Sequence, residues 1–95
     1  MSIDMKHIDG KNVGNVILYA LSTCGWCKKT KRLLNDLAIE YDYIDVDLLD
    51  GIDREEIEKE IKRWNPRCSF PTIVVNQETC VVGFKEEQIK EILSS

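Results

Sequence analysis

The first half of the chain shows three changes of hydrophobic pattern. Val16 to Ala20 is a short apolar run rich in β-forming residues, and its length suits a buried strand better than a helix. From Trp26 to Leu37 the apolar residues recur at helical spacing, while basic and polar residues fill mostly the other side. Residues 41–46 then alternate with the period of two that is typical of a strand. We therefore predict a strand, an amphipathic helix and a second strand.

The second half predicts another helix, a hairpin and a closing helix. Arg54 to Trp64 places apolar residues on one helical face, and Pro66 ends the helix because proline disfavours helical backbone at the residue before it. Two short apolar runs at 72–75 and 80–82 flank a polar connection, which indicates a hairpin. The last predicted helix has one apolar face, which consists of Ile89, Ile92 and Leu93.

This order of elements, β-α-β-α-β-β-α, belongs to the α/β class. Strands separated by a helix form a parallel pair with a right-handed crossover, and a terminal hairpin adds antiparallel neighbours. We therefore expect a four-stranded mixed sheet that three helices cover on both faces. Residues 1–14 contain the turn signal Asp9-Gly10 and form either a leader or a small N-terminal hairpin, and residues 15–95 form the domain.

Composition and charge exclude several classes of protein. The 95 residues are 43% hydrophobic and 32% charged, which is typical of one soluble globular domain without a membrane-spanning run. Residues 1–15 contain no apolar stretch long enough for the core of a signal peptide, so we expect a cytoplasmic location. The net charge of -4 argues against general affinity for nucleic acid or anionic membranes, and we expect a monomer.

A cytoplasmic location changes how the four cysteines are interpreted, because thiols there are kept reduced. A structural disulfide is then disfavoured, and the pair Cys24 and Cys27 indicates thiol-disulfide exchange instead. The pair opens the first predicted helix, where free backbone N–H groups and the positive end of the helix dipole stabilise a thiolate on Cys24. Cys27 lies one turn further into the helix, so it is more shielded and would resolve a mixed disulfide formed by Cys24.

The residues next to the pair have two interpretations each. Trp26 offers a contact surface for a partner, or it anchors the helix in the core. The basic residues that follow attract an acidic partner, or they form an ordinary solvated helix face; they are Lys28, Lys29, Lys31 and Arg32.

The other cysteines and the single histidine weaken a metal-binding alternative. Cys68 and Cys80 do not form a second C-x-x-C, and His7 is the only histidine, so the sequence predicts no metal site. Cys80 lies in a predicted strand and is interpreted as a packing residue. Cys68 lies three residues before Pro71 and is either a plain loop residue or a secondary thiol. Residue pattern alone predicts an ordinary trans bond at Phe70-Pro71.

Three motifs together resemble the glutaredoxin family of the thioredoxin-fold superfamily, over residues 16–93. They are "CGWC" after "VILYALST", "FPT" before "IVV", and "VVGFKEEQI" near the end. The resemblance implies the thioredoxin fold, a nucleophile at Cys24, a resolving cysteine at Cys27 and a cis bond before Pro71. It also implies a substrate-binding surface from Trp26, Phe70, Pro71, Thr72, Val82 and Gly83.

The chain departs from the common glutathione-dependent members of this family. Those members have Cys-Pro-Tyr-Cys, and they have a Gly-Gly pair followed by an aspartate, where this chain has Val82-Gly83 and Phe84-Lys85. The ending is closer to that of the glutaredoxin-like electron donors of ribonucleotide reductase, and to glutaredoxin-like proteins of anaerobic archaea. The resemblance thus implies protein disulfide substrates, ribonucleotide reductase among the candidates, and a reductase protein as electron donor.

Two other functions stay open, and the proton acceptor for Cys27 is not identified. A glutathione-dependent glutaredoxin and an iron-sulfur or metal-binding module are the other functions considered. No resident cofactor is expected beyond the redox-active Cys24–Cys27 disulfide, with glutathione as the alternative. Thioredoxin's buried carboxylate has no counterpart in "VILYA", so the sequence identifies no proton acceptor for Cys27.

Overall fold

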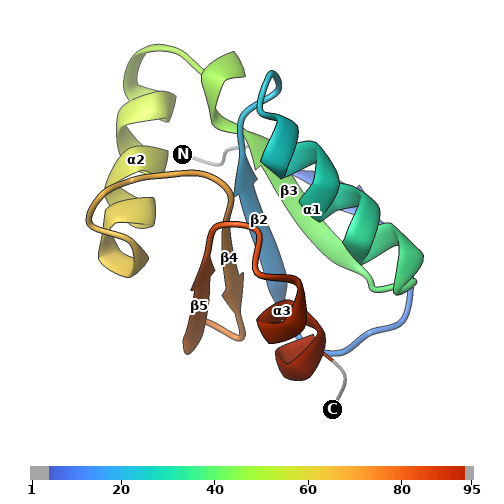
Figure 1. Cartoon of the computed structure of the whole chain (residues 1–95). Coiled ribbons are helices and arrows are strands. Elements are labelled where there is room, and N and C mark those ends of the chain that lie inside the picture. The colour runs from blue at the N-terminus through green and yellow to red at the C-terminus, as the bar shows by residue number, and fades with distance from the viewer. Residues whose placement is uncertain (1–4, 94–95) are drawn as a thin grey trace.

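A computed structural model describes residues 5–93 and contains one five-stranded mixed sheet with three helices (Figure 1). The strand order across the sheet is β1-β3-β2-β4-β5. The elements are β1 (Lys6–Ile8), β2 (Val16–Ala20), α1 (Gly25–Asp36), β3 (Tyr41–Asp45), the 3₁₀ turn η1 (Val46–Leu48), α2 (Gly51–Trp64), β4 (Thr72–Val75), β5 (Thr79–Val82) and α3 (Glu86–Leu93). The predicted thioredoxin fold is confirmed.

The register of the sheet follows from the connections between strands. β2 and β3 are parallel, with Tyr19 beside Ile44, because α1 carries the chain back to the same end of the sheet. β4 lies antiparallel to β2, with Thr72 beside Tyr19, and the β4–β5 hairpin pairs Val74 with Cys80. The carboxyl ends of β2 and β3 therefore meet at one edge of the sheet.

From residue 5 on, the N-terminal segment contains a strand that does not form the suggested hairpin, while residues 1–4 of the suggested leader lie outside the described residues. β1 forms no hairpin with its chain neighbour; it pairs antiparallel with β3, placing His7 opposite Asp42. This pairing adds a fifth strand to the four that the pattern predicts. The sequence pattern does not predict this strand, because its partner, the edge of β3, is distant in sequence. That edge offers free backbone groups for pairing, which no local pattern reveals.

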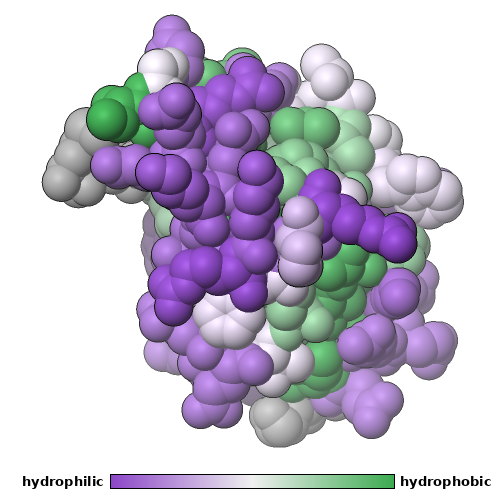
Figure 2. Space-filling view, turned by 90° about the vertical axis from the view of Figure 1, so that its left-hand side faces the viewer, coloured by the Kyte–Doolittle hydropathy of each residue, from purple (hydrophilic) through white to green (hydrophobic). Residues whose placement is uncertain are grey.

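Helices cover both faces of the sheet, as predicted. α1 and α3 lie on one face, where Leu18, Leu34 and Ile89 belong to the larger buried cluster (Figure 1). α2 covers the other face through Ile57 and Ile61, and its outer surface is largely hydrophilic (Figure 2). Alternate residues of the strands point to opposite faces, so one strand contributes to both clusters.

α2 begins at Gly51, three residues before the start that the apolar pattern predicted. Gly51 has a φ of 60°, a value that glycine adopts without the steric cost of a Cβ. Ile52 is 61% exposed and does not belong to the apolar face that marks the rest of the helix. The hydrophobic periodicity therefore does not predict the first turn of α2.

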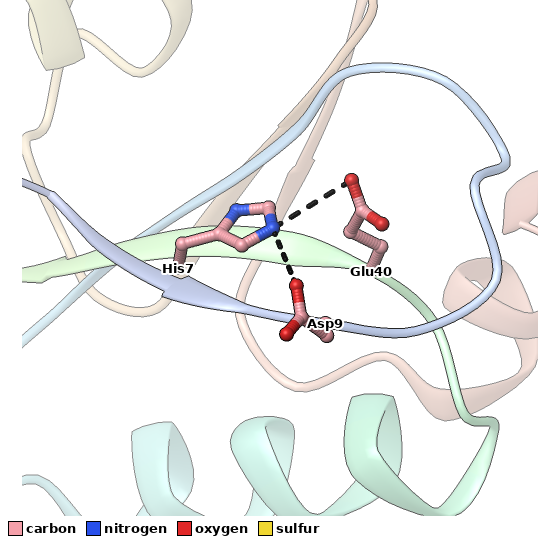
Figure 3. A group of neighbouring side chains, drawn as sticks. All are labelled: His7, Asp9 and Glu40. Carbon is pink, nitrogen blue, oxygen red and sulfur yellow. Dashed lines mark ion pairs between the residues drawn. The ribbon is translucent and has the colours of Figure 1, made fainter.

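An ion-pair network around His7 holds β1 against β3 (Figure 3). Nδ1 lies 2.7 Å from Asp42 Oδ1, while Nε2 lies 3.2 Å from Asp9 Oδ1 and 3.7 Å from Glu40 Oε2. The hydrogen bond with Asp42, followed by the charges of the three carboxylates, raises the pKa of His7 above its ordinary value of 6.5.

This network predicts that the contribution of His7 to stability depends on pH. Because the folded pKa is raised, the contribution is complete below the unfolded pKa and is lost as pH rises through the folded pKa. We expect His7→Gln to lower the unfolding midpoint at pH 5.5 and to leave it nearly unchanged at pH 9. Urea unfolding of both chains at these pH values measures the difference, and an equal loss at both would contradict the electrostatic explanation.

Candidate active site

The loop between β2 and α1 is tied to the segment that follows β3. Asp47 Oδ1 accepts a hydrogen bond of 2.7 Å from the backbone N–H of Ser22, and Asp47 Oδ2 accepts one from the Ser22 hydroxyl. These bonds lower the pKa of Asp47, so its carboxylate is charged at neutral pH. Asp47 lies within reach because the parallel strands end at the same edge of the sheet. Ser22, just before the cysteine pair, is thus bound to η1 by two hydrogen bonds.

Cys24 is the N-cap residue of α1, and its sulfur is part of the cap. Its backbone is extended, with φ -85° and ψ 120°, and its Sγ accepts the backbone N–H of Cys27 at 3.2 Å. Its carbonyl accepts the N–H of Lys28 at 3.1 Å, which starts the regular helix. A negative sulfur is stabilised there by the free N–H groups and by the helix dipole. Cys24 is also partly exposed, so its sulfur is accessible from the surface.

Cys27 has the opposite character, because its side chain is fully buried. Burial, followed by the hydrogen bond with Cys24, raises the pKa of Cys27 to about 12, while a backbone contact with Leu21 and the charge of Lys31 act in the other direction. Cys27 is thus a neutral thiol at physiological pH. The pair combines an accessible sulfur on a helix end with a protonated sulfur beneath it.

An open pocket of about 250 Å³ lies beside the pair. It is lined by Trp26, Phe70, Pro71, Gly83 and Phe84. Four of these five residues are among those that the sequence predicted as substrate contacts. Phe84 was missed as a contact, although an aromatic residue directly after the hairpin glycine was a signal that could have suggested it.

Trp26 lies on the surface and not in the core. Its side chain is 59% exposed, its ring stacks on Phe84 with centroids 5.9 Å apart, and Lys29 Nζ lies 4.5 Å from the ring centroid. The core-anchor interpretation of Trp26 is therefore wrong. The exposed tryptophan, Phe84 and Lys29 form one continuous wall beside the cysteine pair.

The Phe70–Pro71 bond is cis, as the family resemblance implied. The backbone N–H of Gly83 donates to the carbonyl of Pro71 at 2.8 Å, which ties this loop to the end of β5.

A buried network supports the same loop from the side of α2. Thr72 Oγ1 donates to the carbonyl of Ser69 at 2.7 Å and accepts from Asn65 Nδ2 at 3.2 Å. Thr72 and Val82 lie outside the pocket lining, and the roles of all six predicted residues as substrate contacts stay predictions. Asn65 was missed because the sequence marked it only as a helix end.

The other two cysteines are distinct from the pair. All four cysteines are free thiols. Cys68 has a φ of 52° and packs against the cluster under α2, while Cys80 lies partly buried on the edge strand β5. Burial raises the pKa of both thiols above their ordinary value, so both are protonated at neutral pH.

In residues 5–93, the cysteines belong to no group of three or more potential metal ligands. The group found in that range consists of His7, Asp9 and Glu40, whose ligand atoms lie within 4.8 Å of one another (Figure 3). These side chains are partly or fully exposed, and the ion pairs described above account for their arrangement. None of the helices in the same range is long and apolar enough to cross a membrane.

The fold and the site define a class, namely a thioredoxin-fold protein with a C-x-x-C pair at the start of the helix that follows β2. The glutaredoxin family model matches residues 16–80, and the chain belongs to the glutaredoxin family. Membership indicates a thiol-disulfide oxidoreductase activity, and it confirms the resemblance that the three motifs suggested.

Solved structures and a curated relative agree with this assignment. A glutaredoxin from Methanosarcina mazei is 50% identical, with a TM-score of 0.90 over 96% of this chain and 88% of that one. Methanoredoxin from Methanosarcina acetivorans is 48% identical, with a TM-score of 0.87 over 90% of each chain. An uncharacterized glutaredoxin-like 8.6 kDa protein in the rubredoxin operon of Clostridium pasteurianum is 30% identical over 76 residues, 80% of this chain and 93% of that protein.

The tie between Ser22 and Asp47 predicts a local effect of losing the carboxylate. We expect Asp47→Asn to make the Ser22 amide exchange with solvent on the order of tenfold faster, because the hydrogen bond loses the negative charge that strengthens it. Hydrogen exchange measured residue by residue by NMR tests this, with Asp50→Asn as control because the Asp50 side chain makes no capping bond to α2. Unchanged exchange at Ser22 would show that the loop is held by other contacts.

Proposed function

We propose that this protein is a dithiol-disulfide oxidoreductase that reduces protein disulfides through Cys24 and Cys27 and is recharged by a reductase protein. The observation that carries the proposal is the inequality of the two thiols. Cys24 is partly exposed at a helix N-terminus, whereas Cys27 is buried with its pKa raised to about 12. Cys24 is therefore suited to attack the substrate disulfide, and Cys27 is suited to stay protonated until it resolves the mixed disulfide.

The proposed reaction has two steps. The Cys24 thiolate attacks one sulfur of a substrate disulfide, and the other substrate sulfur leaves with the electron pair of the broken bond and takes up a proton. Cys27 then loses its proton and attacks Cys24 Sγ, which breaks the bond between Cys24 and the substrate. The substrate ends as two thiols, and the protein ends with a Cys24–Cys27 disulfide.

The surface around the pair suits a protein substrate. The stacked Trp26 and Phe84 offer an apolar area next to the cis-proline loop. Lys28, Lys29 and Arg32 lie exposed on the same helix. Aromatic and basic side chains together favour a partner that presents an apolar residue beside acidic ones.

The same surface supports a reductase protein as electron source more than it supports glutathione. The γ-glutamyl end of glutathione carries an amine that needs a carboxylate partner, and here Phe84 and Lys85 follow Gly83. Phe84 also stacks on Trp26 and lines the pocket. A glutathione-dependent glutaredoxin remains the alternative.

We expect the two cysteines to differ when each is replaced. Cys24→Ser should abolish reduction of insulin, because no other thiol combines exposure with a helix N-terminus. Cys27→Ser should still attack and should accumulate a mixed disulfide with the substrate, because the resolving sulfur is missing. Non-reducing gels and mass spectrometry detect the trapped species. A mixed disulfide that forms through Cys27 or Cys68 would reverse the assignment.

We expect a reductase protein to reduce the Cys24–Cys27 disulfide at least about tenfold more efficiently than millimolar glutathione does, a difference of about 1.4 kcal/mol in activation free energy. Three systems should be compared by insulin reduction: NADPH with thioredoxin reductase, a ferredoxin-dependent disulfide reductase, and glutathione with its reductase. Visible absorption after anaerobic purification is the control for an iron-sulfur cluster. Rapid turnover with glutathione and no response to either reductase would establish the alternative.

A further inference from the structure

Lys31 differs from the other basic residues of α1, because it is held in place. Its Nζ lies 3.0 Å from Asp45 Oδ1 and 4.2 Å from the centroid of the Tyr43 ring. Its side chain is 22% exposed and that of Asp45 is 16% exposed, so the ion pair is largely shielded from water. Sequence pattern had grouped Lys31 with a solvated strip of basic residues. The structure separates it from that strip.

The held ammonium group lies on the side of α1 that carries Cys27. Lys31 is four residues after Cys27, which places the two side chains on the same side of the helix, one turn apart. Asp45 ends β3 beside Ala20 of β2, the last residue before the loop that leads to Cys24. The salt bridge between Lys31 and Asp45 therefore holds the Lys31 ammonium group at the end of β3, close to the cysteine pair.

Lys31 is the cation whose charge favours a thiolate on Cys27. The groups that bear on Cys27 are Cys24 and the backbone of Leu21 from the preceding loop, and Lys31 from α1 itself. Cys24 and burial disfavour the Cys27 thiolate, while Lys31 favours it. Once Cys24 is bonded to a substrate, its sulfur is no longer charged and no longer opposes a thiolate on Cys27. The charge of Lys31, partly offset by its ion pair with Asp45, then acts in the same direction as the backbone contact with Leu21.

We propose that Lys31, fixed by Asp45 and Tyr43, is a positioning residue for the resolving step, where its charge stabilises the thiolate that Cys27 must form. In that step Cys27 gives up its proton and bonds to Cys24 Sγ. The bond between Cys24 and the substrate sulfur breaks, and the substrate sulfur takes the electron pair and a proton. This inference rests on the proposed dithiol function, although its test does not need the physiological partner.

The test separates the two steps with the small disulfide 5,5′-dithiobis(2-nitrobenzoate). Attack by Cys24 releases a first coloured thiolate, and attack by Cys27 on the resulting mixed disulfide releases a second, so stopped-flow absorbance resolves both. We expect Lys31→Met to slow the second phase about tenfold at pH 7 and to move its pH profile about one unit to higher pH, since one pK unit corresponds to a factor of ten. The first phase should change less than twofold.

Two further variants identify the cause. Lys31→Arg should restore the second phase, because it keeps the positive charge, and Lys59→Met on the exposed surface of α2 should behave like the unchanged protein. Equal slowing of both phases would overturn the proposal. So would an unchanged pH profile, or a Lys31→Arg chain as slow as Lys31→Met.

An equilibrium measurement keeps the proposal testable if turnover is compromised by poor folding. In a Cys24→Ser background, the pKa of Cys27 is followed through thiolate absorbance with and without Lys31→Met, and folding is checked by circular dichroism. The pKa of Cys27 should be higher without Lys31. An unchanged value in folded chains would overturn the inference, whereas failure of Cys27→Ser to trap a protein substrate would overturn only the proposed function.

Discussion

The N-terminus of α1 imposes the constraint on which the site depends. The first turn of a helix leaves backbone N–H groups without partners inside the helix, and here the sulfur of Cys24 accepts the one from Cys27. The sulfur of Cys24 is thus also the cap of the helix that carries the second thiol. This arrangement fixes the separation of the two cysteines and favours negative charge on the outer one. The same bond therefore both caps the helix and places the outer thiol of the pair.

The sheet turns this local arrangement into a site. Because β2 and β3 are parallel, their carboxyl ends bring Asp47 to the loop before Cys24 and Asp45 to Lys31 on α1. The antiparallel β4–β5 hairpin brings Gly83 and Phe84 to the loop of Pro71. The parallel pair thus supports the loop and the helix of the cysteines, while the antiparallel hairpin brings Gly83 and Phe84 to the pocket. The surface that results is apolar at Trp26 and basic along the exposed side of α1.

Much of the fold could be predicted because its cues are local. Strand alternation, helical periodicity and the Asn65-Pro66 stop each involve residues a few positions apart, and they located β2, α1, β3 and β4 closely. The pairing of β1 with β3 and the first turn of α2 escaped this method. The former joins distant segments, and the latter carries an isoleucine that faces solvent.

For the site, the sequence by itself determined that a cysteine pair opens a helix after a strand, and the tertiary structure decided the environment of that pair. Two cysteines three positions apart at a strand-helix junction already predict which thiol would attack, because the helix end is a local feature. Tertiary structure decided that Trp26 lies on the surface, that Lys31 is bound to Asp45, and that Asn65 supports Thr72. These contacts join residues that the chain brings together only through the sheet and the loop before β4. The burial of a side chain and the charges around it depend on distances in space, which the order of residues along the chain does not give.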